Sequence, residues 1–117
     1  IKKKVMRAVT DAGPTMLNQV KPEPIENLFT LMQLVSTPDT YDYFNDQYNN
    51  MAIRYGDMKK QLAADINAFC APIRERILFF QSNEEYLAKV AREGAEAASA
   101  SAEKTIREVR EIIGFRN

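Results

Sequence analysis

The sequence predicts an all-α fold, a compact helical domain of about five helices. No segment alternates apolar and polar residues long enough to indicate a strand, whereas apolar residues recur three and four positions apart in several stretches. The chain has 117 residues, 45% of them hydrophobic and 27% charged, with a net charge of zero. This length and composition predict one domain over residues 1–117 with a core of its own.

The first expected helix covers residues 1–10, where apolar side chains stand at helical spacing before Gly13-Pro14 interrupts the pattern. We expect residues 11–23 to form a loop, because the Pro22 and Pro24 rings cannot both lie inside a helix. Residues 24–117 are then predicted to form the helical bundle, and its first helix runs from Pro24 to about Val35.

Thr37 and Pro38 predict the next helix start, because Thr is a good cap and Pro suits the first helical position. This helix is expected to end near Asn49-Asn50. Another helix should run from about Gly56-Asp57 to about residue 81, carrying a continuous apolar stripe and kinked by the internal Pro72.

The last helix is predicted to begin at a capping box formed by Ser82 and Glu85. Its apolar stripe keeps its phase through Gly94, which favours one long helix to about Ile113 over two short ones. Gly114 should then stop it. Oppositely charged residues four positions apart on its outer face are typical of a solvated surface.

The composition argues against several kinds of chemistry. Without His, the chain lacks an imidazole base, the usual nucleophile pairs and a His-bearing zinc site, and no residue set has metal-ligand spacing. We therefore expect neither catalytic residues nor a metal site. The single Cys70 lies next to Phe69 in an apolar stripe and is interpreted as a small core residue.

The same features predict a location. One cysteine fits a reducing compartment, so we expect a cytoplasmic protein. The uncharged stretch at residues 28–38 is too short for a membrane span, which needs ~20 apolar residues. The chain opens on Ile1 without an initiator Met or a signal peptide, so it is expected to be a piece of a longer protein.

Charge is distributed unevenly along the chain. Residues 1–21 hold five basic side chains and one acidic, whereas residues 22–57 hold one basic and six acidic. This polarity argues against a general polyanion binder but allows a local anion site. Basic side chains in residues 2–7 are one candidate for phosphate contact, with a merely solvated helix end as the alternative.

Lys59 and Lys60 are a second candidate, since they stand near a helix start, where the dipole disfavours cations. A ligand is one explanation, and a solubilising helix face that includes Lys60, Asn67 and Arg74 is the other. The tyrosines of residues 41–55 are able to stack on unpaired bases, although two of the four fall on the core stripe.

Six short motifs occur in order along nearly the whole chain. They are Lys3-Lys4-Val5 to Ala8-Val9-Thr10-Asp11, Lys21-Pro22 leading to Glu26-Asn27-Leu28, Tyr55-Gly56-Asp57-Met58-Lys59, Pro72-Ile73-Arg74-Glu75-Arg76, Arg92-Glu93-Gly94-Ala95-Glu96-Ala97-Ala98, and Val109-Arg110-Glu111 to Gly114-Phe115. This series closely resembles the carboxy-terminal part of bacterial tryptophanyl-tRNA synthetases. The chain departs from the usual pattern at Glu23, where Gly is common, and at Ala97, where Lys is common.

The resemblance implies the helical, anticodon-binding domain that follows the Rossmann-type catalytic domain of a class I aminoacyl-tRNA synthetase. The parent enzyme would attach tryptophan to its tRNA using ATP and Mg, as a homodimer. The two nucleotide-binding signatures of the catalytic domain do not occur in this sequence, so the fragment alone is expected to be inactive and to hold no cofactor. Its expected partners are the tRNA for tryptophan and the parent's catalytic domain, without a membrane.

The resemblance also implies site residues, by position in the motifs. The anticodon candidates lie in the loop after the first helix and at the start of the Gly-x-x-Lys helix: Thr10, Asp11, Gly13, Gly56, Asp57, Lys59 and Lys60. Weaker candidates for backbone contact are Arg7, Arg54 and Arg74. In this interpretation Lys59 donates to a base edge or phosphate, Asp11 accepts from a cytosine amino group, and residues 1–10 connect to the catalytic domain.

Two alternatives remain open on the sequence alone. One is a helical protein-interaction module without RNA binding, which uses the acidic and aromatic stretch of residues 39–55 as its contact surface. The other is the equivalent domain of a tyrosine-specific synthetase. Salt dependence separates an RNA-binding domain from an interaction module, because phosphate contacts weaken as salt rises.

Overall fold

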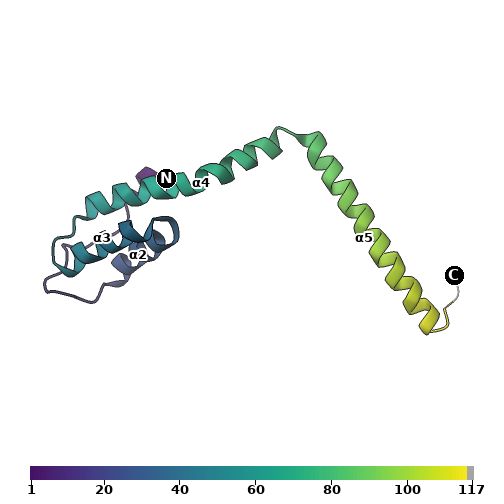
Figure 1. Ribbon diagram of the computed structural model, residues 1–117, viewed down its shortest axis with the longest axis horizontal. Helices are drawn as coiled ribbons and strands as arrows, with labels where there is room; N and C mark the ends of the chain where they lie inside the picture. The colour runs from purple at the N-terminus through teal and green to yellow at the C-terminus, as the bar shows by residue number, and fades with distance from the viewer. Residues whose placement is uncertain (116–117) are drawn as a thin grey trace. The chain divides into compact units, whose positions relative to one another are not determined.

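The computed structural model describes residues 1–115, and every regular element in that range is a helix (Figure 1). The five helices are α1 (Lys2–Met6), α2 (Glu23–Val35), α3 (Pro38–Asn49), α4 (Tyr55–Gln81) and α5 (Glu84–Ile112). The all-α prediction and the expected number of helices are confirmed. Within the described range, no helix combines the length and apolar composition needed to cross a membrane.

The chain divides into two compact units, the first being Ile1–Arg74 and the second beginning at Glu75. The boundary falls inside α4. A single domain over residues 1–117, with a bundle over 24–117, stays a prediction.

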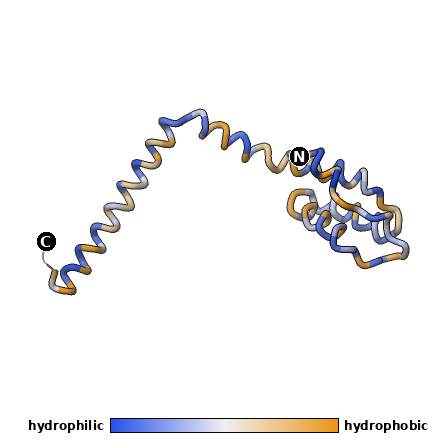
Figure 2. Tube along the Cα trace, turned by 180° about the vertical axis from the view of Figure 1, so that it is seen from behind, coloured by the Kyte–Doolittle hydropathy of each residue, from blue (hydrophilic) through white to orange (hydrophobic). Residues whose placement is uncertain are grey.

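The core of the first unit lies between α2, α3 and the first turns of α4. Figure 2 colours each residue of these helices by its hydropathy. Its buried side chains are Ile25, Leu28, Phe29, Met32, Phe44, Tyr48, Met58 and Leu62. The Phe29 ring meets both Tyr41 and Tyr48 edge-on, with centroids 5.7 and 6.0 Å away. Edge-to-face pairs of this kind add to the stabilisation from burial alone.

The boundaries of α3 follow its capping residues. Thr37 Oγ1 accepts a hydrogen bond from Thr40 N at 3.3 Å, and Pro38 occupies the first position of α3, as predicted. At the other end, α3 stops at Asn49, and Met51 adopts a left-handed φ of +58° that turns the chain toward α4. The predicted stop at Asn49-Asn50 is therefore confirmed.

The first helix is shorter than predicted. α1 ends at Met6 rather than at residue 10, and residues 8–10 leave the helix. Their backbone and side chains bind elsewhere: the Ala8 carbonyl and the Thr10 hydroxyl both accept hydrogen bonds from the Lys59 ammonium. A long-range contact thus ends α1 earlier than its local pattern indicates.

In the second unit α5 is continuous through Gly94, which confirms one long helix. Gly114 takes a φ of +77° beyond its end, as a C-terminal stop requires. The predicted capping box is wrong. The N-cap is Asn83, without a side-chain cap hydrogen bond, while the Ser82 hydroxyl donates back to the Phe79 carbonyl at 2.9 Å.

The apolar stripe of α4 is buried only over its first turns. Met58 and Leu62 are fully covered, whereas the side chains of Phe69, Ile73 and Ile77 are 53%, 50% and 50% exposed. The continuous stripe is therefore covered only in part, because the core residues of α2 and α3 pack against only the first part of the helix. The helix itself runs on through Pro72.

Candidate nucleic-acid interface

Lys59 joins the first turn of α4 to the segment after α1. The residue is buried, with only 8% of its surface exposed. The ammonium Nζ donates to the Ala8 carbonyl at 2.7 Å and to Thr10 Oγ1 at 3.1 Å. Both acceptors are uncharged, so Lys59 forms no ion pair here. Its ammonium instead holds residues 8 and 10 against α4 through two hydrogen bonds, an arrangement that we call the Lys59 clamp. A buried charge needs such partners to offset its desolvation.

Asp11 makes the second tether of the same segment. Its Oδ1 accepts from the backbone N of Gly13 at 2.8 Å and from the Tyr55 hydroxyl at 2.9 Å. The first bond closes a tight turn in which Gly13 adopts a φ of +109°, a conformation that glycine tolerates and other residues rarely adopt. The second bond fixes this turn against the start of α4.

The Tyr55 hydroxyl is held in its neutral, donating form. Burial raises the pKa of Tyr55 well above its ordinary value, and the hydrogen bond to Asp11 and the charge of that carboxylate raise it further. A neutral phenol is the state that can donate to a carboxylate. Tyr55 therefore keeps, at physiological pH, the proton that it donates to Asp11.

These contacts bring together the predicted residues of the loop and of the helix start. Thr10, Asp11 and Gly13 form a turn that is fastened to α4 through Lys59 and Tyr55. Both of the Asp11 hydrogen bonds use Oδ1 of its exposed side chain, and within residues 1–115 none is formed by its Oδ2. Tyr55 was not among the predicted anticodon contacts. Its place in the Tyr-Gly-Asp motif did not indicate that its hydroxyl bonds to Asp11, 44 positions earlier in the chain.

The remaining helix-start residues are exposed. Lys60 lies on the surface and pairs with Asp57 at 3.8 Å, with 65% and 58% of the two side chains exposed. An exposed ion pair of this geometry contributes little to stability. A side chain added at Gly56 would meet nothing within 4 Å, so packing does not require glycine there. Arg54 caps the helix with its carbonyl, which accepts from the backbone N of Asp57 and of Met58 at 3.1 Å each.

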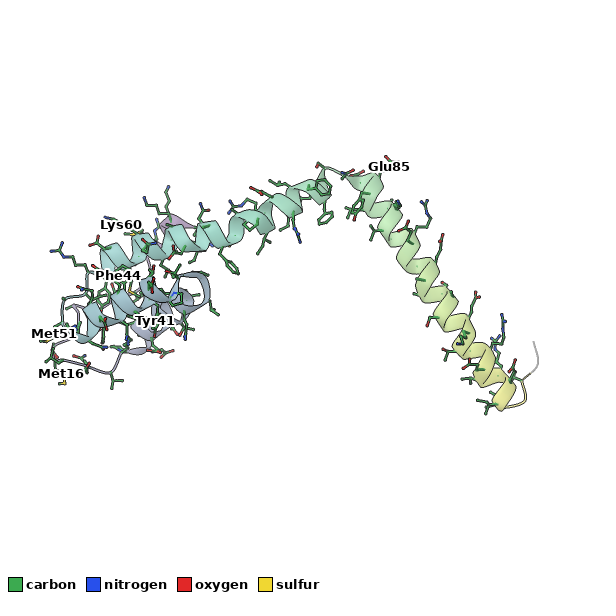
Figure 3. The ribbon with its side chains drawn as sticks, viewed as in Figure 1. Met16, Tyr41, Phe44, Met51, Lys60 and Glu85 are labelled. Carbon is green, nitrogen blue, oxygen red and sulfur yellow. The ribbon has the colours of Figure 1, made fainter. Side chains whose placement is uncertain are left out.

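A basic depression of about 380 Å³ lies between α1 and α4. Ile1, Lys2, Lys60, Ala63, Ala64 and Asn67 line it. It unites Lys60 and Asn67, which the sequence placed on one helix face, with a lysine from the amino-terminal cluster. Figure 3 labels Lys60 on α4 in this unit. Two ammonium groups and an amide beside one hollow suit a phosphate group.

The weaker backbone candidates are less closely connected to this arrangement. Arg7 caps the end of α1 and is exposed, and Arg74 is exposed at the last position of the first unit. Neither is among the residues that fasten the turn at Asp11. Across residues 1–115, no group of three or more His, Cys, Asp or Glu side chains is arranged to hold a metal ion.

Sequence comparison relates the chain to one part of two longer ligases. It is 63% identical over 116 residues, which is 99% of this chain and 36% of the relative, to the tryptophan–tRNA ligase of Porphyromonas gingivalis. It is also 33% identical to tryptophan–tRNA ligase 1 of Streptomyces coelicolor, over 98% of this chain and 33% of the relative. No family model matches the sequence, and no solved structure matches it.

The share of each sequence that is aligned shows how much of the relatives this chain corresponds to. The chain is homologous, over nearly all its length, to a part of tryptophan–tRNA ligases. It spans about a third of the length of these relatives. The resemblance inferred from the six motifs is thereby confirmed.

Proposed function

We propose that this chain is the carboxy-terminal anticodon-recognition domain of a tryptophan–tRNA ligase. The observation that carries the proposal is the double fastening of residues 8–13 to the start of α4, by Lys59 on one side and by Asp11 with Tyr55 on the other. A rigid turn that presents a carboxylate oxygen suits an unpaired base, whose edges are open to hydrogen bonding.

In this proposal the roles of the two lysines differ. Lys59 is a positioning residue, because its donors hold Ala8 and Thr10 in the turn. Lys60 and Lys2 line the basic depression and contact a phosphate of the tRNA backbone. Asp11 accepts from the amino group of a cytosine in the anticodon.

The rest of the enzyme lies outside this chain. The parent would activate tryptophan with ATP and Mg and transfer it to the tRNA in its catalytic domain, in the cytoplasm and as a homodimer. α1 would connect to that domain. Both relatives are tryptophan-specific by name, which supports the tryptophan type over the tyrosine type.

Fluorescence anisotropy with a labelled anticodon stem-loop tests the proposal. Asp11→Asn keeps the shape of the side chain but removes the charged acceptor, so we expect the preference for a CCA loop to fall about 5- to 150-fold, the range of one good polar contact to a base. Glu103→Gln, on the exposed face of α5, is the matched control and should bind as the wild type does.

The opposite results have clear meanings. A wild-type chain that folds but binds no stem-loop contradicts the proposal and favours a protein-interaction module. A CCA preference that survives in Asp11→Asn refutes the role of this carboxylate.

A further inference from the structure

A second hollow lies where α3 ends and α4 begins. It encloses about 210 Å³, and Tyr43, Phe44, Gln47, Ala52, Arg54 and Asp57 line it. Figure 3 labels Phe44, on α3, and Met51, in the connection to α4. We call this hollow the Tyr43 pocket. None of the predicted anticodon contacts except Asp57 belongs to it, and Arg54 was considered only for backbone contact.

The backbone around the Tyr43 pocket is fixed by hydrogen bonds. Ala52 N donates to the Gln47 carbonyl at 2.8 Å, and Met51 N donates to the Tyr48 carbonyl at 3.1 Å. On the other wall, the Arg54 carbonyl accepts from two amides of the first turn of α4. The pocket is therefore formed before any ligand arrives, which lowers the entropic cost of binding.

One wall of the pocket is aromatic and presents a ring to solvent. Phe44 is buried, with 7% exposed, whereas Tyr43 is 57% exposed. The two rings meet edge-to-face, with centroids 5.0 Å apart and planes at 80°. Phe44 thus supports Tyr43 from inside, and the remaining surface of the Tyr43 ring is a stacking platform of the kind that unpaired bases use.

The polar groups of the pocket indicate a neutral, planar ligand. Gln47 supplies an amide donor and an acceptor, Arg54 supplies donors only, and Asp57 supplies acceptors only. The Arg54 guanidinium and the Asp57 carboxylate carry opposite charges, so the lining of the pocket has no net positive charge that would favour a phosphate. A nucleobase edge carries donors and acceptors side by side, and it matches this mixed set.

We propose that the Tyr43 pocket binds one unpaired nucleobase of the tRNA, stacked on Tyr43 and read at its edge by Gln47, Arg54 and Asp57. The proposal rests on the proposed function and adds a second base site to the turn at Asp11. Tyr55, which holds Asp11, and Asp57, which lines the pocket, are two residues apart at the same end of α4.

The experiment combines protein variants with stem-loops that lack single bases. Anisotropy is measured for the CCA stem-loop and for a series in which one loop nucleotide at a time is abasic. Tyr43→Leu should weaken binding of the intact stem-loop about 5- to 150-fold, the range for losing one base–aromatic stack, and Tyr43→Phe should restore it. Tyr86→Leu, at an exposed tyrosine of the second unit, is the matched control.

A double-mutant cycle then identifies the bound base. At one loop position the abasic probe should cost the wild type at least the factor that Tyr43→Leu costs, because it loses the edge contacts as well as the stack. With that probe, Tyr43→Leu should cause no further loss. At the other positions the losses should multiply. Arg54→Gln should show the same pattern, with Arg107→Gln on α5 as its control.

The outcomes separate this proposal from the proposed function. If the wild type prefers CCA while Tyr43→Leu and Arg54→Gln bind every probe as the wild type does, the Tyr43 pocket is not a base site and the anticodon role stands. Losses that multiply at all loop positions, or that Tyr86→Leu reproduces, also overturn the pocket. If the folded wild type binds no stem-loop, the proposed function fails and the pocket proposal fails with it.

Discussion

Replacing Lys59 by methionine should loosen the turn at residues 8–13 and destabilise the first unit. Lys59→Met keeps an unbranched side chain for the buried stem but removes the ammonium and its two hydrogen bonds, to Ala8 at 2.7 Å and to Thr10 at 3.1 Å. Hydrogen bonds to a charged group contribute ~1.5–3 kcal/mol each to stability.

The net cost should be smaller than the sum of two such bonds. Ala8 and Thr10 are half-buried, so water can reach the acceptors once the ammonium is gone. The variant also avoids the desolvation of a charge on a residue that is only 8% exposed. We therefore expect the free energy of unfolding to fall by about 2 kcal/mol, toward the lower end of the range for charged hydrogen bonds.

Urea unfolding followed by circular dichroism measures this loss, and amide hydrogen exchange localises it. Lys60→Met is the matched control, because Lys60 is an exposed neighbour whose ion pair with Asp57 should be worth ~0.5 kcal/mol or less. Faster exchange at Gly13, whose amide donates to Asp11, should accompany the loss. Equal stability of the two variants would refute a stabilising role for the hydrogen bonds of Lys59.

Three further predictions concern stability, pH and salt. Phe29→Ala should cost about 3–5 kcal/mol in urea unfolding, since Phe29 is 1% exposed, whereas Phe79→Ala at a 53% exposed ring should cost much less; similar losses would contradict the position of the core. The raised pKa of Tyr55 means that its contribution to stability is present below the pKa of an unfolded tyrosine, about 10, and is lost as pH rises through the higher folded value. Tyr55→Phe should therefore reduce the loss of stability above that pH in pH-dependent unfolding, and an unchanged alkaline profile would show that Tyr55 is not its source. Lys60→Gln should lower the slope of log affinity against log salt for the stem-loop by about 0.7, and an unchanged slope would remove Lys60 from the phosphate contacts.

The sequence predicted helix boundaries well where these depend on contacts between residues that are close together in the chain. Thr37 and Pro38 mark the start of α3 in both sequence and structure, because the cap needs only the next three residues. Gly94 did not divide α5, as the unbroken phase of the stripe indicated. The capping box failed because the Ser82 hydroxyl has a competing acceptor in the preceding turn, the Phe79 carbonyl.

Long-range contacts explain what the sequence did not predict. Lys59 stood out because the helix dipole disfavours a cation there, and a ligand was one explanation; its acceptors instead lie 51 and 49 positions earlier in the chain. Tyr55 and Tyr43 look alike in sequence, yet one bonds to Asp11 and the other stands 57% exposed on Phe44. Helical periodicity likewise marks an apolar face without saying whether another helix covers it, as the exposed Ile73 shows.

The most direct test of the central claim compares the affinity of the wild-type chain for two anticodon stem-loops, one bearing CCA and one with a changed anticodon, at the same salt concentration. Recognition through the turn at Asp11 predicts tighter binding of CCA by at least ~5-fold, as one specific polar base contact provides. Equal affinity for the two stem-loops, in protein whose helicity matches the structure, would contradict anticodon recognition by this chain.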